Sequence, residues 1–447
     1  MRERVATVAS HRTTEAMLAA ACTVAIVLGR HALPWFVPPV LAFGGAALAS
    51  DLAHREHRDP GPVRPLAWVI TALLVFAVLS PARLPNDLRP YAADGRIVAH
   101  YHRNPYVALP HEFASDPVFA RVRDAPAPYG PLFLGAAAAS GVLTQATTLP
   151  ARVPYQAGAA LAVGAALVLL WRARRSTAAL ALVGLHPAVA GTIVNGGHND
   201  AFIGLALLAA VLAAERRRYL GAGAIVAAGA FVKATAGLAL VPLAVWSFAR
   251  GGRRAALAVV APTALLVVPL TLATPGMLHA VHATNRGIVT RTSIWNLDPL
   301  RAPVTPRLGD GTVTQLAIVL IAVAVVIVSF SRRSLATRVT GAAAAWLVLS
   351  AYVMPWYTVW ALPVAALEPR RPMSRVVAWQ GAVVTAAFLV PHRLLGNWFV
   401  SFSFGWIASV ALFVAFVRAL RSPPDAGESP GVPVRRVLPG ARSLRAS

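Results

Sequence analysis

Long uninterrupted apolar runs, separated by short arginine-rich turns, constrain this chain more than any other feature. Of its 447 residues, 57% are hydrophobic and 13% are charged, whereas about a quarter of the residues in ordinary soluble domains are charged. Inside a bilayer, backbone groups must bond to one another, which leaves helices or a closed barrel. The runs are continuous rather than alternating, which favours helices. The sequence therefore predicts an all-α integral membrane protein.

The apolar runs predict about 14 spans, several of them shorter than the ~20 residues that cross a bilayer comfortably. They fall near residues 14–29, 34–52, 66–84, 152–171, 175–193, 200–214, 219–233, 236–249, 254–272, 314–330, 337–352, 354–367, 375–391 and 399–418. We expect residues 1–421 to form a single transmembrane domain. Residues 422–447 are rich in Pro, Gly, Ser and Arg, and we expect a disordered basic cytoplasmic tail.

Arginine clusters between the spans predict the orientation of the chain. Examples are Arg172 with Arg174, the run 216–218, and Arg332 with Arg333. Cytoplasmic loops carry an excess of Lys and Arg, so both termini are expected in the cytoplasm and residues 85–151 outside. The net charge of +24 is then explained by topology and by attraction to anionic lipid, not by nucleic acid. The predicted location is the plasma membrane, with a multi-pass chain.

One apolar run conflicts with this orientation. Residues 129–146 are apolar enough to span, but a full crossing would move every later arginine cluster to the outside. We therefore predict a partial or re-entrant helix that enters from the outer face, which is tolerated where protein buries the backbone.

The first outer loop, residues 85–128, holds the best candidates for chemistry. Asp87 follows the third span closely and could act as a general base toward a sugar hydroxyl. Spacing alone favours the alternative that Asp87 caps the following helix. Asp94 is the second candidate for the base. The histidines of this loop have no ligand spacing specific for metal, so we predict no metal and no cofactor.

Two further segments on the predicted outer side carry polar groups. His198, Asn199 and Asp200 follow two glycines at the start of an apolar run, where they could bind a ligand or cap the helix. Lys233 is the sole lysine in an arginine-rich chain. A compact ammonium suits a phosphate in a narrow site, and snorkelling to the membrane interface is the alternative.

The later outer loop and a downstream aromatic segment add weaker candidates. Arg286 and Arg291 lie in the outer loop 273–313, where they could bind a lipid phosphate or lie at the headgroups. Trp356 and Tyr357 fall at a predicted interface. The interfacial aromatic belt explains them more readily, and stacking on a sugar is the alternative.

Taken in order, several short motifs resemble the actinobacterial polyprenyl-phosphomannose-dependent α-1,6-mannosyltransferases, a family of the GT-C superfamily of membrane glycosyltransferases. The motifs lie between about residues 66 and 365: Asp87 with Tyr91 and Gly95, Asn104-Pro105-Tyr106, Pro128-Tyr129-Gly130-Pro131-Leu132, the run Gly196–Asp200, Lys233, and Pro355-Trp356-Tyr357 with Trp360.

This resemblance implies a GT-C-like helical bundle with a large first outer loop and an active site on the outer face. It implies a polyprenyl-phosphate-mannose donor and a lipid-linked mannan or lipoglycan acceptor. Asp87 matches the family's general base, with Asp94 as the fallback. His198, Asn199, Asp200, Lys233 and Tyr129, with Arg286 and Arg291, are expected to bind the donor phosphate or sugar.

Three alternatives stay open at the level of sequence. A GT-C relative could transfer another sugar, such as glucose or arabinofuranose. A transporter or flippase of lipid-linked sugars would also need many spans, but it should carry ionisable groups at mid-membrane. The acids here concentrate in outer loops, which favours the transferase. A scaffold without activity is the third alternative.

Overall fold

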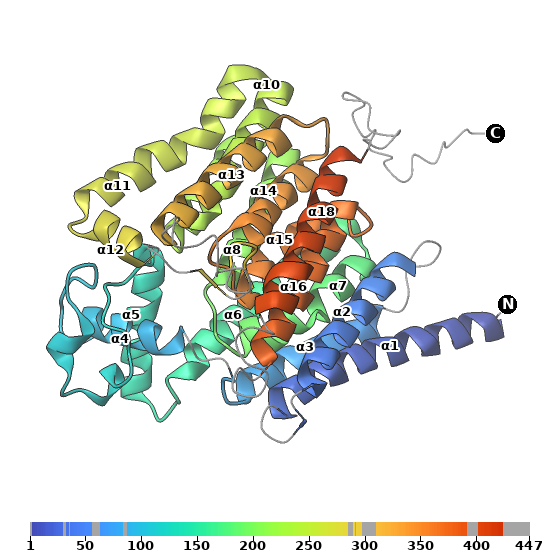
Figure 1. Ribbon diagram of the computed structural model, residues 1–447, viewed down its shortest axis with the longest axis horizontal. Helices are drawn as coiled ribbons and strands as arrows, with labels where there is room; N and C mark the ends of the chain where they lie inside the picture. The colour runs from blue at the N-terminus through green and yellow to red at the C-terminus, as the bar shows by residue number, and fades with distance from the viewer. Residues whose placement is uncertain are drawn as a thin grey trace, which may run out of the picture.

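The computed structural model describes residues 2–29, 33–34, 36–55, 63–83, 87–284, 289–290, 292–296, 310–390 and 401–422. Throughout this described part the regular structure is helical, with no strand (Figure 1). The α-helices are α1 (Arg2–Gly29), α2 (Val37–Arg55), α3 (Val63–Leu79), α4 (Leu88–Ala99), α5 (Pro131–Ala146), α6 (Arg152–Arg174), α7 (Thr177–Gly184), α8 (Asp200–Glu215), α9 (Tyr219–Ala230), α10 (Leu240–Pro262), α11 (Val268–Ala273), α12 (Met277–Thr284), α13 (Asp310–Phe330), α14 (Leu335–Leu349), α15 (Thr358–Ala365), α16 (Pro372–Leu389) and α18 (Ala408–Arg421).

Shorter turns join these helices. They are the 3₁₀ turns η1 (Pro110–Phe113), η2 (Pro117–Phe119), η4 (Ala234–Ala239) and η8 (Pro355–Tyr357), and the π-helical turns η3 (Val189–Val194), η5 (Thr263–Val267) and η9 (Ser401–Ile407). Residues 423–447, which make up nearly all of the predicted tail, lie outside the described residues.

Four helical segments are long and apolar enough to cross a membrane, by length and composition: 152–174, 234–273, 311–330 and 402–421. Six further apolar helices of the described chain have 10–17 residues. The chain is therefore a helical membrane protein, as predicted, and the count of about 14 spans stays a prediction.

Two helix breaks fall at residues that cannot continue a helix. Gly252 has a φ of 67° and separates the two halves of α10, where the sequence predicts the gap between spans 236–249 and 254–272. The predicted span 175–193 is interrupted: α7 ends at Gly184, and Pro187 precedes the π-helical turn η3. Proline lacks the N–H that a helix needs at that position.

Several arginine-rich turns meet at one end of the bundle. Arg174 forms an ion pair with Glu215 at 3.4 Å and donates to the backbone oxygen of Leu367. Arg333 donates to the backbone oxygen of Leu420 at 2.9 Å. Ser334, which follows α13, donates to Glu368, which follows α15, at 2.7 Å and joins these two groups of contacts. The ends of α6, α8, α13, α15 and α18 therefore lie together, which agrees with a shared side for these turns.

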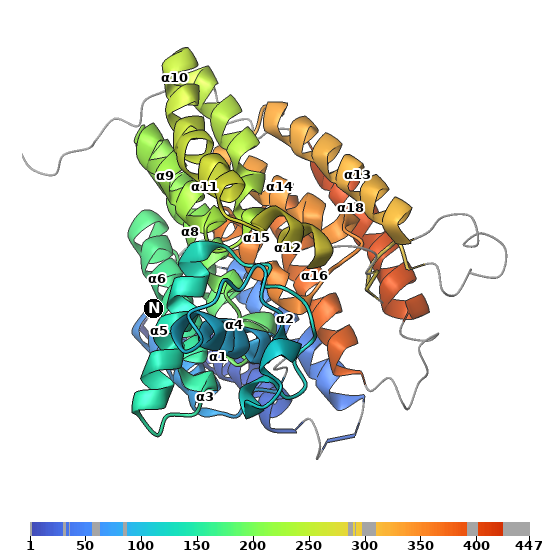
Figure 2. The same ribbon diagram turned by 90° about the vertical axis from the view of Figure 1, so that its left-hand side faces the viewer.

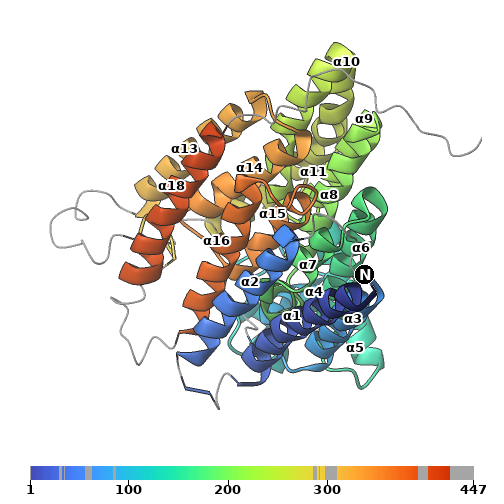
Figure 3. The ribbon, with the colours of Figure 1, turned by 90° about the vertical axis from the view of Figure 1, so that its right-hand side faces the viewer.

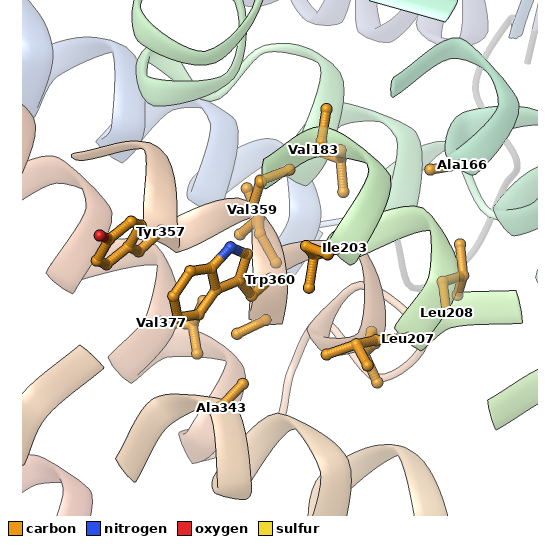
Figure 4. Packing of buried hydrophobic residues seen from close by; sticks show 14 of the residues in the cluster. Ala166, Val183, Ile203, Leu207, Leu208, Ala343, Tyr357, Val359, Trp360 and Val377 are labelled. Carbon is orange, nitrogen blue, oxygen red and sulfur yellow. The ribbon is translucent and has the colours of Figure 1, made fainter. Parts of the chain in front are cut away.

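The C-terminal helices α13, α14, α16 and α18 lie side by side (Figures 1 and 3). The centre of the molecule is built from α8 and α15, where Trp360 is buried among Ile203, Leu207 and Val377 (Figure 4). A close contact between these two helices places the N-terminal end of α8 beside Trp360 of α15.

Residues 100–128 form a compact unit with α4 and α5 (Figures 1 and 2). Phe113 and Phe119 pack with Ile97 of α4 into a small separate core. Asn104 donates to the backbone oxygen of Pro275 at 3.1 Å, which joins this loop to the turn before α12. Helix α5 has 16 residues, about 24 Å at 1.5 Å per residue, less than the ~30 Å of a bilayer core. Its partial insertion stays a prediction.

Candidate active site

Four charged or titratable side chains from three distant segments gather at one place. Asp87 precedes α4, His198 and Asp200 lie at the start of α8, and Lys233 lies between α9 and η4. Ligand atoms of Asp87, His198 and Asp200 all lie within 4.8 Å of one another, and Nζ of Lys233 lies 2.9 Å from Oδ1 of Asp200. We call these four residues the polar cluster.

Asp87 is held by side chains and does not cap its helix. Its side chain makes no capping bond, so the interpretation of Asp87 as a cap is wrong. Oδ2 instead lies 3.1 Å from Nδ1 of His198 and 3.5 Å from the Tyr91 hydroxyl. Burial raises the pKa of Asp87, but the hydrogen bond and charge of His198, with the charge of Lys233, together bring that pKa below its usual value. The carboxylate is therefore ionised at neutral pH. The side chain of Asp87 is 21% exposed.

His198 is fully buried between Asp87 and an aromatic ring. Its imidazole stacks on Trp356, with ring centroids 3.9 Å apart and planes 11° apart. Among the described residues, Nε2 has no hydrogen-bond partner. Because an ionised carboxylate only accepts hydrogen bonds, Nδ1 of His198 carries a proton and donates it to Asp87. His198 thus orients the carboxylate of Asp87 and stabilises its charged form.

Asp200 and Trp360 fix the position of Lys233. Oδ1 of Asp200 accepts from Lys233 at 2.9 Å and from Nε1 of Trp360 at 2.6 Å. The ammonium lies over the rings of Tyr357 and Trp360, 4.6 and 5.4 Å from their centroids. Lys233 is 16% exposed and points to these partners, so the snorkelling interpretation is wrong. An ammonium has three N–H donors, so Lys233 can bind an acceptor of a ligand as well as Asp200.

The contact between α8 and α15 depends on a glycine. A Cβ at Gly204 would lie 2.2 Å from the backbone oxygen of Val359. Only glycine allows the two backbones to approach this closely, and the approach places Asp200 within reach of Trp360. The packing of α8 on α15 therefore positions Trp360, the ring over which Lys233 lies (Figure 4).

Aromatic side chains surround the polar cluster from two sides. Trp356 and Tyr357 are 1% and 7% exposed, so the interpretation of an interfacial aromatic belt is wrong for both. Tyr129 packs edge-on against Tyr91, with centroids 5.0 Å apart. The next residue, Gly130, donates its N–H to the backbone oxygen of Val232, which brings Tyr129 close to Lys233 in the chain fold.

Two predicted residues lie at the margin of the polar cluster. Asp94 shares a helix face with Asp87 but is two turns further along α4, about 10 Å away. Burial raises the pKa of Asp94 to about 8. Asn199 is buried and its side chain makes no capping bond; within the described chain, neither atom of its amide has a partner. The interpretation of Asn199 as a helix cap is therefore wrong.

The polar cluster has the donor set of a divalent-cation site, with two carboxylates and one imidazole. The ammonium of Lys233 already contacts Asp200, and a metal ion would have to share that carboxylate. The absence of a metal stays a prediction.

Arg286 and Arg291 lie outside the described residues. Sequence reasoning gave no role to Asn195, the first residue of the polar run before α8, and missed Gln156. Both are buried amides that bind the end of α3. Gln156 carried a visible signal, since a polar side chain inside a predicted span calls for a partner.

Ionisable groups buried among apolar helices are costly unless they are used, so the polar cluster marks a functional site in a membrane protein. Comparison with known proteins then indicates which family of membrane proteins the chain belongs to. Residues 3–250 match the family model described as "Alpha-(1->6)-mannopyranosyltransferase, N-terminal domain". The chain therefore belongs to the α-(1→6)-mannopyranosyltransferase family and is a glycosyltransferase.

A named relative agrees with this assignment. The chain is 29% identical over 406 residues to α-(1→6)-mannopyranosyltransferase A of Mycobacterium tuberculosis (strain ATCC 25618 / H37Rv), covering 82% of this chain and 76% of the relative. No solved structure matches the chain. Family and relative together indicate α-1,6-mannosyltransferase activity, with a sugar donor and a glycan acceptor.

Proposed function

We propose that this protein transfers mannose from polyprenyl-phosphate-mannose to a lipid-linked mannan or lipoglycan acceptor. An acceptor hydroxyl oxygen attacks the anomeric carbon while the bond from that carbon to the phosphate oxygen breaks. The hydroxyl proton passes to Asp87, and the polyprenyl phosphate leaves as a phosphomonoester. A single displacement converts the β-linked donor into an α-linked product. Sugar transfer of this kind uses an oxocarbenium-like transition state.

The observation that carries this proposal is the pairing of a base with a fixed cation. Asp87 is ionised and oriented by His198 at 3.1 Å, which suits it to accept a proton. Lys233 is fixed by Asp200 at 2.9 Å and is proposed to stabilise the charge that develops on the leaving phosphate. Tyr129 and Asn199 are the proposed sugar contacts, with Arg286 and Arg291 as further phosphate ligands. Sugar stacking on Trp356 and Tyr357 does not fit the structure, because His198 covers the ring of Trp356 and Trp360 that of Tyr357.

We place this reaction on the outer face of the plasma membrane, in a GT-C-like multi-pass bundle with both termini in the cytoplasm. The grouping of arginine-rich turns at one end of the bundle supports this orientation. The apolar surfaces of the helices can pack against the hydrophobic polyprenyl tail of the donor.

The test is transfer of radiolabelled mannose from polyprenyl-phosphate-mannose into lipid-linked mannan by membranes that express the protein. Matched donors carrying glucose or arabinofuranose, and membranes without the protein, are the controls. We expect transfer from the mannose donor and an α-1,6 linkage in the product. Transfer from another sugar donor alone, or none with a competent acceptor present, would contradict the proposal.

A further inference from the structure

A buried amide joins the chain segments that carry Asp87 and His198. Asn195 follows the π-helical turn η3 and lies three residues before His198. Its Nδ2 donates to the backbone oxygens of Ala77 and Pro81, each at 3.1 Å. Its Oδ1 accepts the backbone N–H of Arg83 at 2.9 Å. One side chain therefore binds both donors and acceptors of residues 77–83, at the end of α3 and just after it.

Gln156 and Arg152 of α6 complete this arrangement from the other side. Nε2 of Gln156 donates to the backbone oxygen of Asn195 at 2.7 Å and to that of Ser80 at 3.2 Å. Arg152 donates to Oε1 of Gln156 at 2.6 Å and to the oxygen of Ser80 at 2.9 Å. Both amides are fully buried, where an unmade hydrogen bond is costly.

The π-helical turn explains why Asn195 reaches α3. In η3 the N–H of Asn195 bonds to the oxygen of Ala190, five residues earlier, at 3.1 Å. The extra residue in this turn rotates the next residues of the chain, relative to their place in an ordinary α-helix. Single π-helical turns occur often at functional sites, and here the turn directs Asn195 to α3 and leads into His198.

We infer that Asn195 and Gln156 form a positioning clamp that sets the distance between Asp87 and His198. The inference rests on the proposed function, in which Asp87 is the base. Neither amide contacts the reacting groups, so both are positioning residues. Arg83 precedes Asp87 by four residues in the sequence and Asn195 precedes His198 by three, and we expect a shift at the clamp to move one partner relative to the other.

A looser clamp should affect the chemical step more than donor binding. Asp87 faces His198, Lys233, Asp200 and the hydroxyl of Tyr91. Of the hydrogen bonds described for its side chain, the one from His198 is the shorter, at 3.1 Å, and His198 lies on the chain segment that the clamp holds. Lys233 is held by Asp200, and the close contact of α8 with α15 at Gly204 keeps Asp200 on Trp360 without any bond to the clamp residues. Misplacement of a base by about 1 Å lowers rates by as much as ~100-fold.

The test compares Asn195→Ala and Gln156→Met with wild-type protein at equal membrane levels. We expect kcat to fall by about 10- to 100-fold, with the donor KM unchanged. The acid limb of kcat/KM should move up by about one pH unit, because Asp87 loses the hydrogen bond that stabilises its charged form. The control is Ser374→Ala, which removes bonds from a buried hydroxyl to the backbone oxygens of Ala365 and Glu368; its pH profile should match wild type.

Hydrogen exchange on the same samples tests the clamp without any transfer. We expect faster exchange across residues 80–91 in Asn195→Ala and Gln156→Met, and wild-type exchange there in Ser374→Ala. Unchanged exchange, or a wild-type pH profile despite lower kcat, would overturn the inference. An inactive wild-type protein with faster exchange in the clamp variants would instead contradict the proposed function.

Discussion

The hydrogen bond between His198 and Asp87 gives the reaction a defined pH dependence. His198→Phe keeps the ring that stacks on Trp356 but removes the donor to Asp87. The pKa of Asp87, lowered by His198 in the native protein, should then rise. Because the base must be ionised to accept a proton, the acid limb of kcat/KM should move to higher pH by about one unit.

The control for this change is a second histidine–aspartate pair. His111 lies 2.9 Å from Asp124 in the loop between α4 and α5, and both are well exposed. His111→Phe should leave the acid limb where it is. Equal shifts in both variants would show that His198 has no special effect on the base.

Lys233 lies between two rings and a carboxylate, in a site built for a small cation. Lys233→Met should lower kcat/KM by about 100-fold, the usual cost of losing one electrostatic contact to developing charge. Lys233→Arg should not restore wild-type activity, because a planar guanidinium needs more room than an ammonium. Arg172→Lys, an exposed position on α6, is the control and should transfer at the wild-type rate. Full activity in Lys233→Arg would contradict the proposed close fit.

At the scale of elements, the contact between α4 and α5 supports the helix that begins after Asp87. A Cβ at Gly95 would lie 2.3 Å from the backbone oxygen of Ala137. Gly95→Ala should therefore destabilise the protein by about 1–3 kcal/mol and lower its Tm in detergent. Gly135→Ala on α5 meets no atom within 4 Å, so it should be neutral or slightly stabilising. Equal Tm values for the two variants would contradict this packing.

The sequence alone identified the residues of the polar cluster but not their bonds. Charged groups are scarce in an apolar chain, so Asp87, Asp200 and Lys233 stood out without any structural information. The local sequence also allowed a helix cap for the aspartates and a snorkelling side chain for Lys233. It could not decide against these interpretations, because it carries no information on partners that are distant in the chain. Asp87 and His198 are 111 residues apart in the chain, and only the fold brings them together.

The same limit applies to the elements. Hydropathy located most helices within a few residues, since apolar length is a local property. It could not foresee η3, where a proline and a π-helical turn break a continuous apolar run. Nor could it distinguish aromatic residues at the membrane interface from Trp356 and Tyr357, which are buried against the polar cluster.

At the scale of the whole molecule, the proposed orientation can be tested with single cysteines. Cys22 is the one native cysteine, so Cys22→Ser gives a cysteine-free background. An impermeant maleimide applied to spheroplasts should label Ser115→Cys and Thr148→Cys, which lie at exposed positions on either side of α5. Arg216→Cys should be labelled only after permeabilisation. Labelling of Ser115→Cys without Thr148→Cys would show that α5 crosses the membrane.

The central claim is that Asp87 accepts the proton in mannosyl transfer. Asp94 is the competing carboxylate, but its pKa of about 8 keeps it largely protonated at neutral pH, and an asparagine mimics a neutral carboxyl group. The most direct measurement is mannose transfer at pH 7 by wild type, Asp87→Asn and Asp94→Asn at equal membrane levels. We predict that Asp87→Asn loses about 100-fold or more and that Asp94→Asn stays near wild type. Loss in Asp94→Asn with activity retained in Asp87→Asn would contradict the assignment of the base.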